Sequence, residues 1–241
     1  MTARRRRNFL ILLALTVLVA LVGFGVIQYL RSQSTSVLRT SRLMTFLRNP
    51  QEHSDWIIPA STRCGTAPFI FPTDGYIGFL WDDSFRPGHR HQGIDIFGGQ
   101  EPNFTPVLAA YPGYLSRLED WKSSLIVRIP SDPLQPDRQI WTYYTHMADE
   151  QGNSFISPEF PPGTQEVYIE AGTPLGYQGN YSGSPGNPTG IHLHFSIILD
   201  DGQGKFLNEL EIDNTLDPSL YLGLELNANS GVKDVPLCSV N

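Results

Sequence analysis

Short runs rich in β-branched and aromatic residues follow one another along most of this 241-residue chain. Gly, Pro, Asn and Asp separate the runs, which is typical of short strands joined by tight turns. No long segment with helical periodicity interrupts them, so the sequence predicts a mainly β domain built on an antiparallel sheet. The runs expected to form strands are YIGFLW (76–81), GIDIF (93–97), YLSRL (114–118), SLIVRI (124–129), IWTYYTH (140–146), EVYIEAG (166–172) and IHLHFSIIL (191–199).

The N-terminal part of the chain has a different composition. An uncharged, apolar run at residues 9–27 follows Arg4 to Arg7. About 20 apolar residues suffice for a helix to cross a bilayer, and a basic cluster beside such a helix tends to remain cytoplasmic. A cleavable signal peptide shares the basic start, but its apolar region usually has only about 7–15 residues. The sequence therefore favours a cytoplasmic segment at 1–8, a single transmembrane anchor at 9–30, a tether with one short amphipathic helix at 31–58, and an extracytoplasmic domain at 59–241 with its core at 70–222.

Charge is divided in the same way. The first 48 residues contain eight Arg and no acidic residue, whereas residues 49–241 contain nine Lys and Arg against 24 Asp and Glu, a formal charge of −15. Because a phosphate backbone is bound mainly by Lys and Arg, nucleic acid is not an expected partner of the outer domain.

The two cysteines of the chain, Cys64 and Cys238, lie near the two ends of the predicted outer domain. Disulfides form and persist outside the cytoplasm. An even number of cysteines placed in this way favours an intramolecular disulfide, and two unpaired buried thiols are the alternative interpretation.

Three short motifs contain the groups best suited to chemistry: H-Q-G-I-D from His91 to Asp95, Y-T-H ending at His146, and H-L-H from His192 to His194. Imidazole and carboxylate are N and O ligands that zinc accepts, and three protein ligands leave a fourth position for water. Taken alone, each motif has a simpler interpretation, such as exposed imidazoles or a loop hydrogen bond. Their occurrence together and in this order favours a site.

The spacing within the motifs is compatible with one common site. Period-two alternation along a strand places His192 and His194 on one face, roughly 7 Å apart at the backbone. Gly93 allows a backbone conformation or a close approach that a side chain would hinder, so that His91 and Asp95 can both turn inward.

The ordered set of motifs resembles the lysostaphin-type or LytM-like zinc endopeptidases over about residues 70–222. The resemblance rests on GHRHQGIDIFG (88–98), YYTHM (143–147), GIHLHF (190–195), the connecting segments TPVLAAYPGYLSRL (105–118) and AGTPLGYQGNYSGSPGNPTGIHLHF (171–195), and LDPSLYL (216–222).

Carried over position by position, the resemblance implies that His91, Asp95 and His194 bind zinc. It also implies that His146 and His192 are the catalytic histidines beside the metal. Strand geometry alone does not distinguish His192 from His194, so this division of roles comes from the family only.

Three segments depart from the family pattern. Asp82 and Asp83 precede the first motif where family members often have Gly and Arg, and the family's glycine-rich turn is reduced to DWKSS (120–124). Residues 148–170 look longer than the family's connection after Y-x-H. We expect the longer segment to rise near His146, where it would shape or cover the groove.

The function that the resemblance implies is hydrolysis of peptide bonds in cell-wall peptidoglycan by a metal-activated water. Two other functions stay open: a non-catalytic regulator or scaffold of other wall hydrolases, and a zinc peptidase acting on secreted peptides or proteins. The intact His91/Asp95/His194 ligand set favours the enzyme over the regulator.

Overall fold

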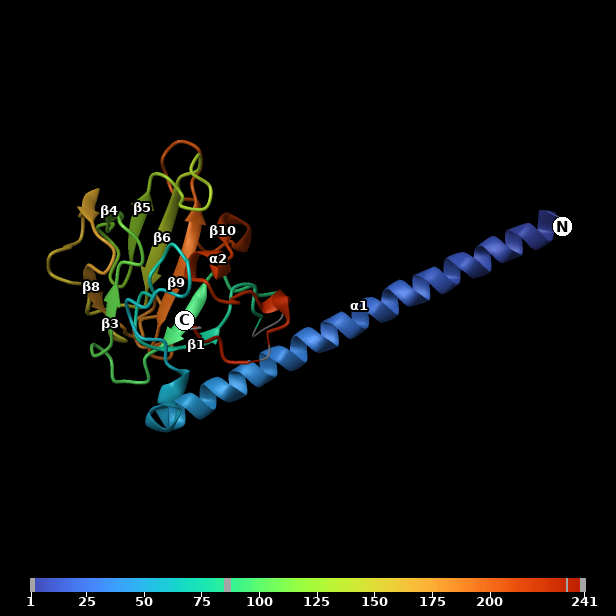
Figure 1. The fold of residues 1–241 in the computed structure, drawn as a ribbon, viewed down its shortest axis with the longest axis horizontal. Coiled ribbons are helices and arrows are strands. Elements are labelled where there is room, and N and C mark those ends of the chain that lie inside the picture. Colours follow the sequence, from blue (N-terminus) through green and yellow to red (C-terminus); the bar gives the residue numbers. More distant parts are fainter. Residues whose placement is uncertain (1–2, 85–87, 233, 239–241) are drawn as a thin grey trace.

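A computed structural model of the protein describes residues 3–84, 88–232 and 234–238. It consists of a β domain and one long helix, α1 (Ala3–Arg48), whose N-terminal part extends away from the domain (Figure 1). A 3-10 helix, η1 (Pro50–Trp56), follows α1 and leads into the domain.

Helix α1 contains the segment that the sequence predicts to be a membrane anchor. Among the residues that the structure describes, no helix is both long enough and apolar enough to cross a membrane. The predicted transmembrane anchor at 9–30 is therefore not confirmed.

An antiparallel sheet forms the centre of the domain. Its strands lie in the order β1 (Tyr76–Phe79), β2 (Ile94–Phe97), β9 (Leu193–Leu199), β6 (Ile140–Thr145), β5 (Leu125–Ile129), β4 (Gly113–Ser116) and β7 (Val167–Ile169), and β10 (Thr215–Leu216) pairs with the second half of β9. Each of the seven predicted runs overlaps one of the strands β1, β2, β4, β5, β6, β7 and β9, so the prediction of a mainly β, antiparallel domain is confirmed.

Three further strands were not predicted. β3 (Pro106–Leu108) and β8 (Pro174–Tyr177) pair with each other in a separate two-stranded sheet, and β10 (Thr215–Leu216) extends the main sheet. The C-terminal region also contains η2 (Ile212–Asn214), α2 (Ser219–Leu222) and η3 (Ala228–Ser230).

The two faces of the main sheet have different surroundings. Alternate residues of the central strands, such as Ile94 and Ile96 in β2 and Leu193 and Phe195 in β9, are fully buried in the main hydrophobic core together with residues of β3, β8 and α2. Because side chains alternate along a strand, the residues between them point to the opposite face. Asp95 and His194 occupy such positions, so the candidate site lies on the face away from the main core.

The end of α1 packs against this second face. Leu43 and Phe46 are buried in a small cluster with Tyr76 of β1 and Phe97 of β2. The structure thus differs from the predicted tether at 31–58: the helix continues to Arg48, and its last turns are part of the domain.

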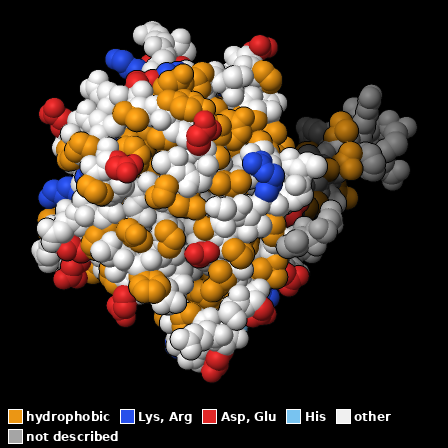
Figure 2. All heavy atoms as spheres, turned by 60° about the vertical axis from the view of Figure 1, so that its left-hand side comes forward, with side chains coloured by type: hydrophobic (Ala, Val, Ile, Leu, Met, Phe, Trp, Pro, Cys, Tyr) orange, Lys and Arg blue, Asp and Glu red, His pale blue; other side chains and the backbone are white. Residues whose placement is uncertain are grey.

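On one side of the domain, charged side chains are scattered singly. Figure 2 shows the side of the domain that carries β3, β4 and β8, where single acidic side chains stand among hydrophobic and neutral ones and basic side chains do not gather into a patch.

Cys64 and Cys238 form a disulfide with a Cα–Cα distance of 5.2 Å, which confirms the predicted pairing.

Candidate metal centre

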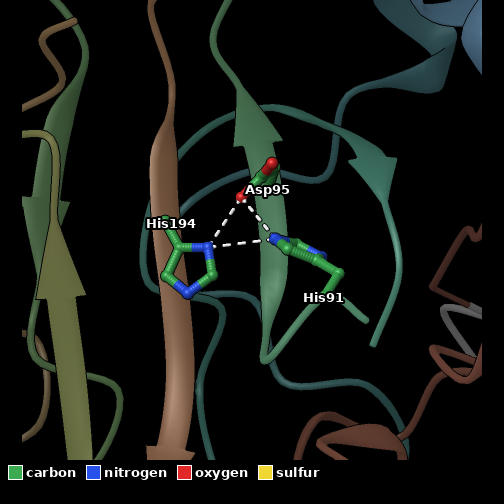
Figure 3. A group of neighbouring side chains, drawn as sticks. All are labelled: His91, Asp95 and His194. Carbon is green, nitrogen blue, oxygen red and sulfur yellow. Dashed lines mark hydrogen bonds and ion pairs between the residues drawn. The ribbon is translucent and has the colours of Figure 1, made fainter. Parts of the chain in front are cut away.

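The side chains of His91, Asp95 and His194 converge on one point (Figure 3). His91 Nε2 lies 3.1 Å from Asp95 Oδ1 and 3.1 Å from His194 Nδ1, and His194 Nδ1 lies 2.9 Å from Asp95 Oδ1. Ligand atoms bound to one zinc ion at about 2.0–2.2 Å lie roughly 3 Å from one another. The spacing of these three atoms therefore suits a single small cation.

Strand register brings the three residues together. Asp95 in β2 and His194 in β9 are direct cross-strand partners, and His91 lies in the segment that enters β2. A Cβ atom on Gly93 would lie 2.2 Å from the carbonyl oxygen of Phe195 in β9. Gly93 thus permits a close approach of backbones, one of the two roles expected from the sequence, and this approach sets the position of both flanking ligands.

Replacing Gly93 by Ala is expected to destabilise the domain by about 2 kcal/mol or more, since the new methyl group forces β2 away from β9. Urea unfolding followed by circular dichroism measures the change. Gly190→Ala is the matched control, because a Cβ there meets only Phe97 at an ordinary 3.5 Å. Equal stability of Gly93→Ala and the parent would contradict this account of the glycine.

His91 is held by three hydrogen bonds to one short segment. Its Nδ1 lies 2.9 Å from the Leu80 carbonyl oxygen, its backbone N–H donates to the Asp83 carbonyl at 2.9 Å, and its own carbonyl accepts from the Asp82 N–H at 2.8 Å. A carbonyl oxygen only accepts, so Nδ1 carries the proton and Nε2 keeps a lone pair that faces Asp95 and His194.

His146 and His192 stand beside the three candidate ligands. Their ring centroids are 4.5 Å apart, and His192 Nε2 lies 3.5 Å from Asp95 Oδ1. His146 Nδ1 donates to the Tyr181 carbonyl at 2.6 Å, and His192 Nδ1 donates to the Gly190 carbonyl at 2.7 Å. Both rings therefore keep a lone pair on Nε2, as His91 does.

The backbone at His146 is unusual. Thr145, the last residue of β6, is the cross-strand partner of His194, and the chain then turns through His146 with φ +72°. Few residues with a side chain adopt this left-handed region, and those that do are frequent at functional sites. The turn ends the strand and places the His146 ring beside His192.

Electrostatics at the site favour bound positive charge. Burial opposes ionisation of Asp95, but the neighbouring rings of His91 and His192 outweigh it, so the Asp95 pKa lies well below its usual range. Burial lowers the pKa of His91, but the Asp95 carboxylate raises it by more, so the net shift of the His91 pKa is upward. A proton on His91 and a divalent cation compete for the same place, as is usual for metal sites.

The imidazoles of His146 and His194 favour the neutral form. Burial, with the nearby rings of His192 and His194, lowers the pKa of His146 to about 3. Burial lowers the pKa of His194 as well, although Asp95 partly offsets this. Neutral imidazoles are the form that binds metals or accepts protons from water.

The site lies in a groove with a volume of about 1110 Å³. Sequence reasoning missed two of its walls: the last turns of α1 line one side, and Glu209 and Leu210 line another. Among the described residues that line the groove, none comes from 148–170, so the expected cover over His146 is not found there. The lining includes Val37, Met44, Leu47, Ser124, Tyr143, Thr145, Tyr181 and Ser182 together with the five motif residues.

The fold and the site together define an antiparallel β domain with a candidate mononuclear metal centre of two histidines and one aspartate. No protein-family model and no curated protein matches the sequence.

Several solved structures are similar to this chain, and they include peptidases of the lysostaphin and LytM type, the group that the motifs resemble. The catalytic domain of the antimicrobial peptidase lysostaphin from Staphylococcus simulans has 19% sequence identity and a TM-score of 0.38, covering 62% of this chain and 89% of that one. The catalytic domain of the prophage-encoded M23 protein EnpA from Enterococcus faecalis, as an A109H mutant, has 21% identity and a TM-score of 0.37, covering 62% and 95%. A putative glycyl-glycine endopeptidase LytM from Ruminococcus gnavus has 20% identity and a TM-score of 0.36, covering 61% and 59%.

Proposed function

We propose that this protein is a zinc-dependent endopeptidase that hydrolyses peptide bonds of cell-wall peptidoglycan. The observation that carries the proposal is the convergence of two imidazole nitrogens and one carboxylate oxygen within an open groove, next to two more histidines with lone pairs on Nε2. A three-ligand set leaves room for water, which is the arrangement of catalytic rather than structural zinc sites.

In this proposal His91, Asp95 and His194 hold the metal through Nε2, Oδ1 and Nδ1. The donor set fits zinc, because it combines borderline nitrogen ligands with one negative charge. When bound at such a site, zinc lowers the pKa of a water molecule and polarises a carbonyl group.

The proposed catalytic residues are His146 and His192. One Nε2 lone pair accepts a proton from the attacking water, and the proton is then delivered to the nitrogen of the leaving amine. The Nδ1 bonds to the Tyr181 and Gly190 carbonyls hold the two rings in the required tautomer. Proton transfer by a positioned group is worth roughly 10²–10⁴ in rate.

Two observations support an extracytoplasmic substrate. The Cys64–Cys238 disulfide suits an oxidising compartment. The motifs resemble those of a family that cleaves wall peptides.

The test is digestion of purified peptidoglycan by the full chain, with metal content measured on the same preparation. We expect about one zinc per chain and new amino termini in the soluble fragments, both lost after treatment with a chelator and restored by zinc. Bound zinc with hydrolysis of unrelated secreted peptides but not of peptidoglycan would favour the secreted-protein peptidase. Bound zinc without any hydrolysis would favour the non-catalytic regulator.

A further inference from the structure

We propose that Arg39 of α1 is a positioning residue for the metal centre and acts on His91 through Asp83. The inference rests on the proposed metal centre, and it adds a part of the chain outside the sheet to that centre. It also accounts for Asp83, an acidic residue in the stretch where the resembled family often has Gly and Arg.

The two side chains form a bidentate, buried ion pair. Arg39 Nε donates to Asp83 Oδ2 at 2.7 Å, and Arg39 Nη2 donates to Asp83 Oδ1 at 2.7 Å. The side chains are only 8% and 2% exposed. Paired N–H···O bonds of this kind fix orientation as well as distance.

Arg39 belongs to the face of α1 that packs on the domain. It lies four residues before Leu43 and seven before Phe46, a spacing that puts all three on one side of a helix, and all three are buried. The docked helix end therefore delivers the guanidinium to Asp83 in a defined place.

Asp83 in turn holds the proposed ligand. Its carbonyl oxygen accepts the backbone N–H of His91, while the adjoining Asp82 N–H donates to the His91 carbonyl. The carbonyl of Leu80, two residues before Asp82, accepts a hydrogen bond from His91 Nδ1. Segment 80–83 thus positions both the backbone and the ring of His91, and Arg39 binds the Asp83 carboxylate of this segment.

Stability alone does not account for this pair. Arg39 Nη1 is buried and has no hydrogen-bond partner among the described residues, so the desolvation of the guanidinium is incompletely compensated. A buried ion pair of this kind is often no more stable than two well-packed apolar side chains. Loss of one partner is different, because it leaves the other charge buried and unpaired.

Without Arg39, the Asp83 carboxylate is expected to turn toward water and draw its own carbonyl away from the His91 N–H. Groups that orient a metal ligand typically change metal affinity by about 10–100-fold when they are removed. We therefore expect Arg39→Met to weaken zinc binding by about tenfold or more.

The experiment measures the zinc affinity of folded, full-length variants by competition with a chelator, alongside the absorption spectrum after replacement of zinc by cobalt(II). Arg39→Lys keeps the positive charge but cannot form the bidentate pair, and it should lose less zinc affinity than Arg39→Met. The double variant Arg39→Met/Asp83→Leu removes both charges and should recover much of the affinity. Arg42→Met is the matched control, because Arg42 lies on the same helix and pairs with the exposed Asp234 at 3.6 Å.

The outcomes separate the positioning role from its alternatives. Parent-like zinc affinity and cobalt spectrum in Arg39→Met, with only lower stability toward urea, would show that the pair serves folding alone and overturn the inference. An equal loss of affinity in Arg42→Met would overturn it too, since charge on the helix in general would then be responsible. If the parent itself bound no zinc, the proposed function would fail together with this inference, whereas a parent that binds zinc isolates the role of Arg39.

Discussion

Replacing His91, Asp95 or His194 by Ala is expected to remove bound zinc and hydrolysis of peptidoglycan together. Each of the three contributes one of the atoms that converge at the site, and two protein ligands do not hold the ion tightly. Because removal of a group that merely supports a ligand costs about 10–100-fold in affinity, loss of a ligand itself should exceed 100-fold. Metal analysis and a digestion assay on one preparation measure both quantities.

His146→Ala and His192→Ala are expected to behave differently. Neither His146 nor His192 is among the three residues whose ligand atoms converge, so each variant should retain close to one zinc per chain. Turnover should nevertheless fall by roughly 10²–10⁴, the usual contribution of positioned proton transfer.

Circular dichroism provides the control for folding in this series, and Gln92→Ala provides a control for mutation within the groove lining. The assignment of the H-L-H pair would be reversed if His192→Ala lost zinc while His194→Ala kept it. Parent-like digestion by all five variants would rule out the enzyme.

Strands were predictable where the residue pattern was long enough. Every predicted run overlaps a strand of the main sheet, because β-branched and aromatic side chains alternate or cluster there. β3 and β8 were missed for a physical reason. Each has three or four residues and begins with Pro, and β8 also contains Gly176, so local composition indicates a turn more than a strand. They pair because tertiary packing brings them together.

The candidate site was predictable in its residues but not in its walls. Strand alternation and the close approach at Gly93 follow from the motifs, and both are found in the β2–β9 pair. The position of α1 does not follow from local pattern, since Arg39, Leu43 and Phe46 become meaningful only once Asp83, Tyr76 and Phe97 are placed beside them. Such contacts join residues far apart in the chain, which spacing within a motif cannot indicate.

Removing the Cys64–Cys238 disulfide is expected to be the most destabilising change outside the metal centre. The bond joins residues 174 positions apart, and closure of a loop of that size restricts the unfolded chain by about 5 kcal/mol in the loop-entropy model. Cys64 is buried in the main core and Cys238 packs partly against it, so the bond also fastens the C-terminal segment to the start of the domain.

Urea unfolding of the oxidised parent, the reduced parent and the Cys64→Ser/Cys238→Ser variant measures this effect. We expect the last two to unfold at similar, lower urea concentrations, with a melting temperature about 10–20 °C below that of the oxidised parent. The slope of the free energy of unfolding against urea should be steeper without the bond, because the unfolded chain then exposes more surface. Zinc should be removed from all three samples first, since a ligand that binds only the folded state would mask part of the difference. Equal stability of the oxidised and reduced parent would show that the bond does not restrict the unfolded chain to any useful extent.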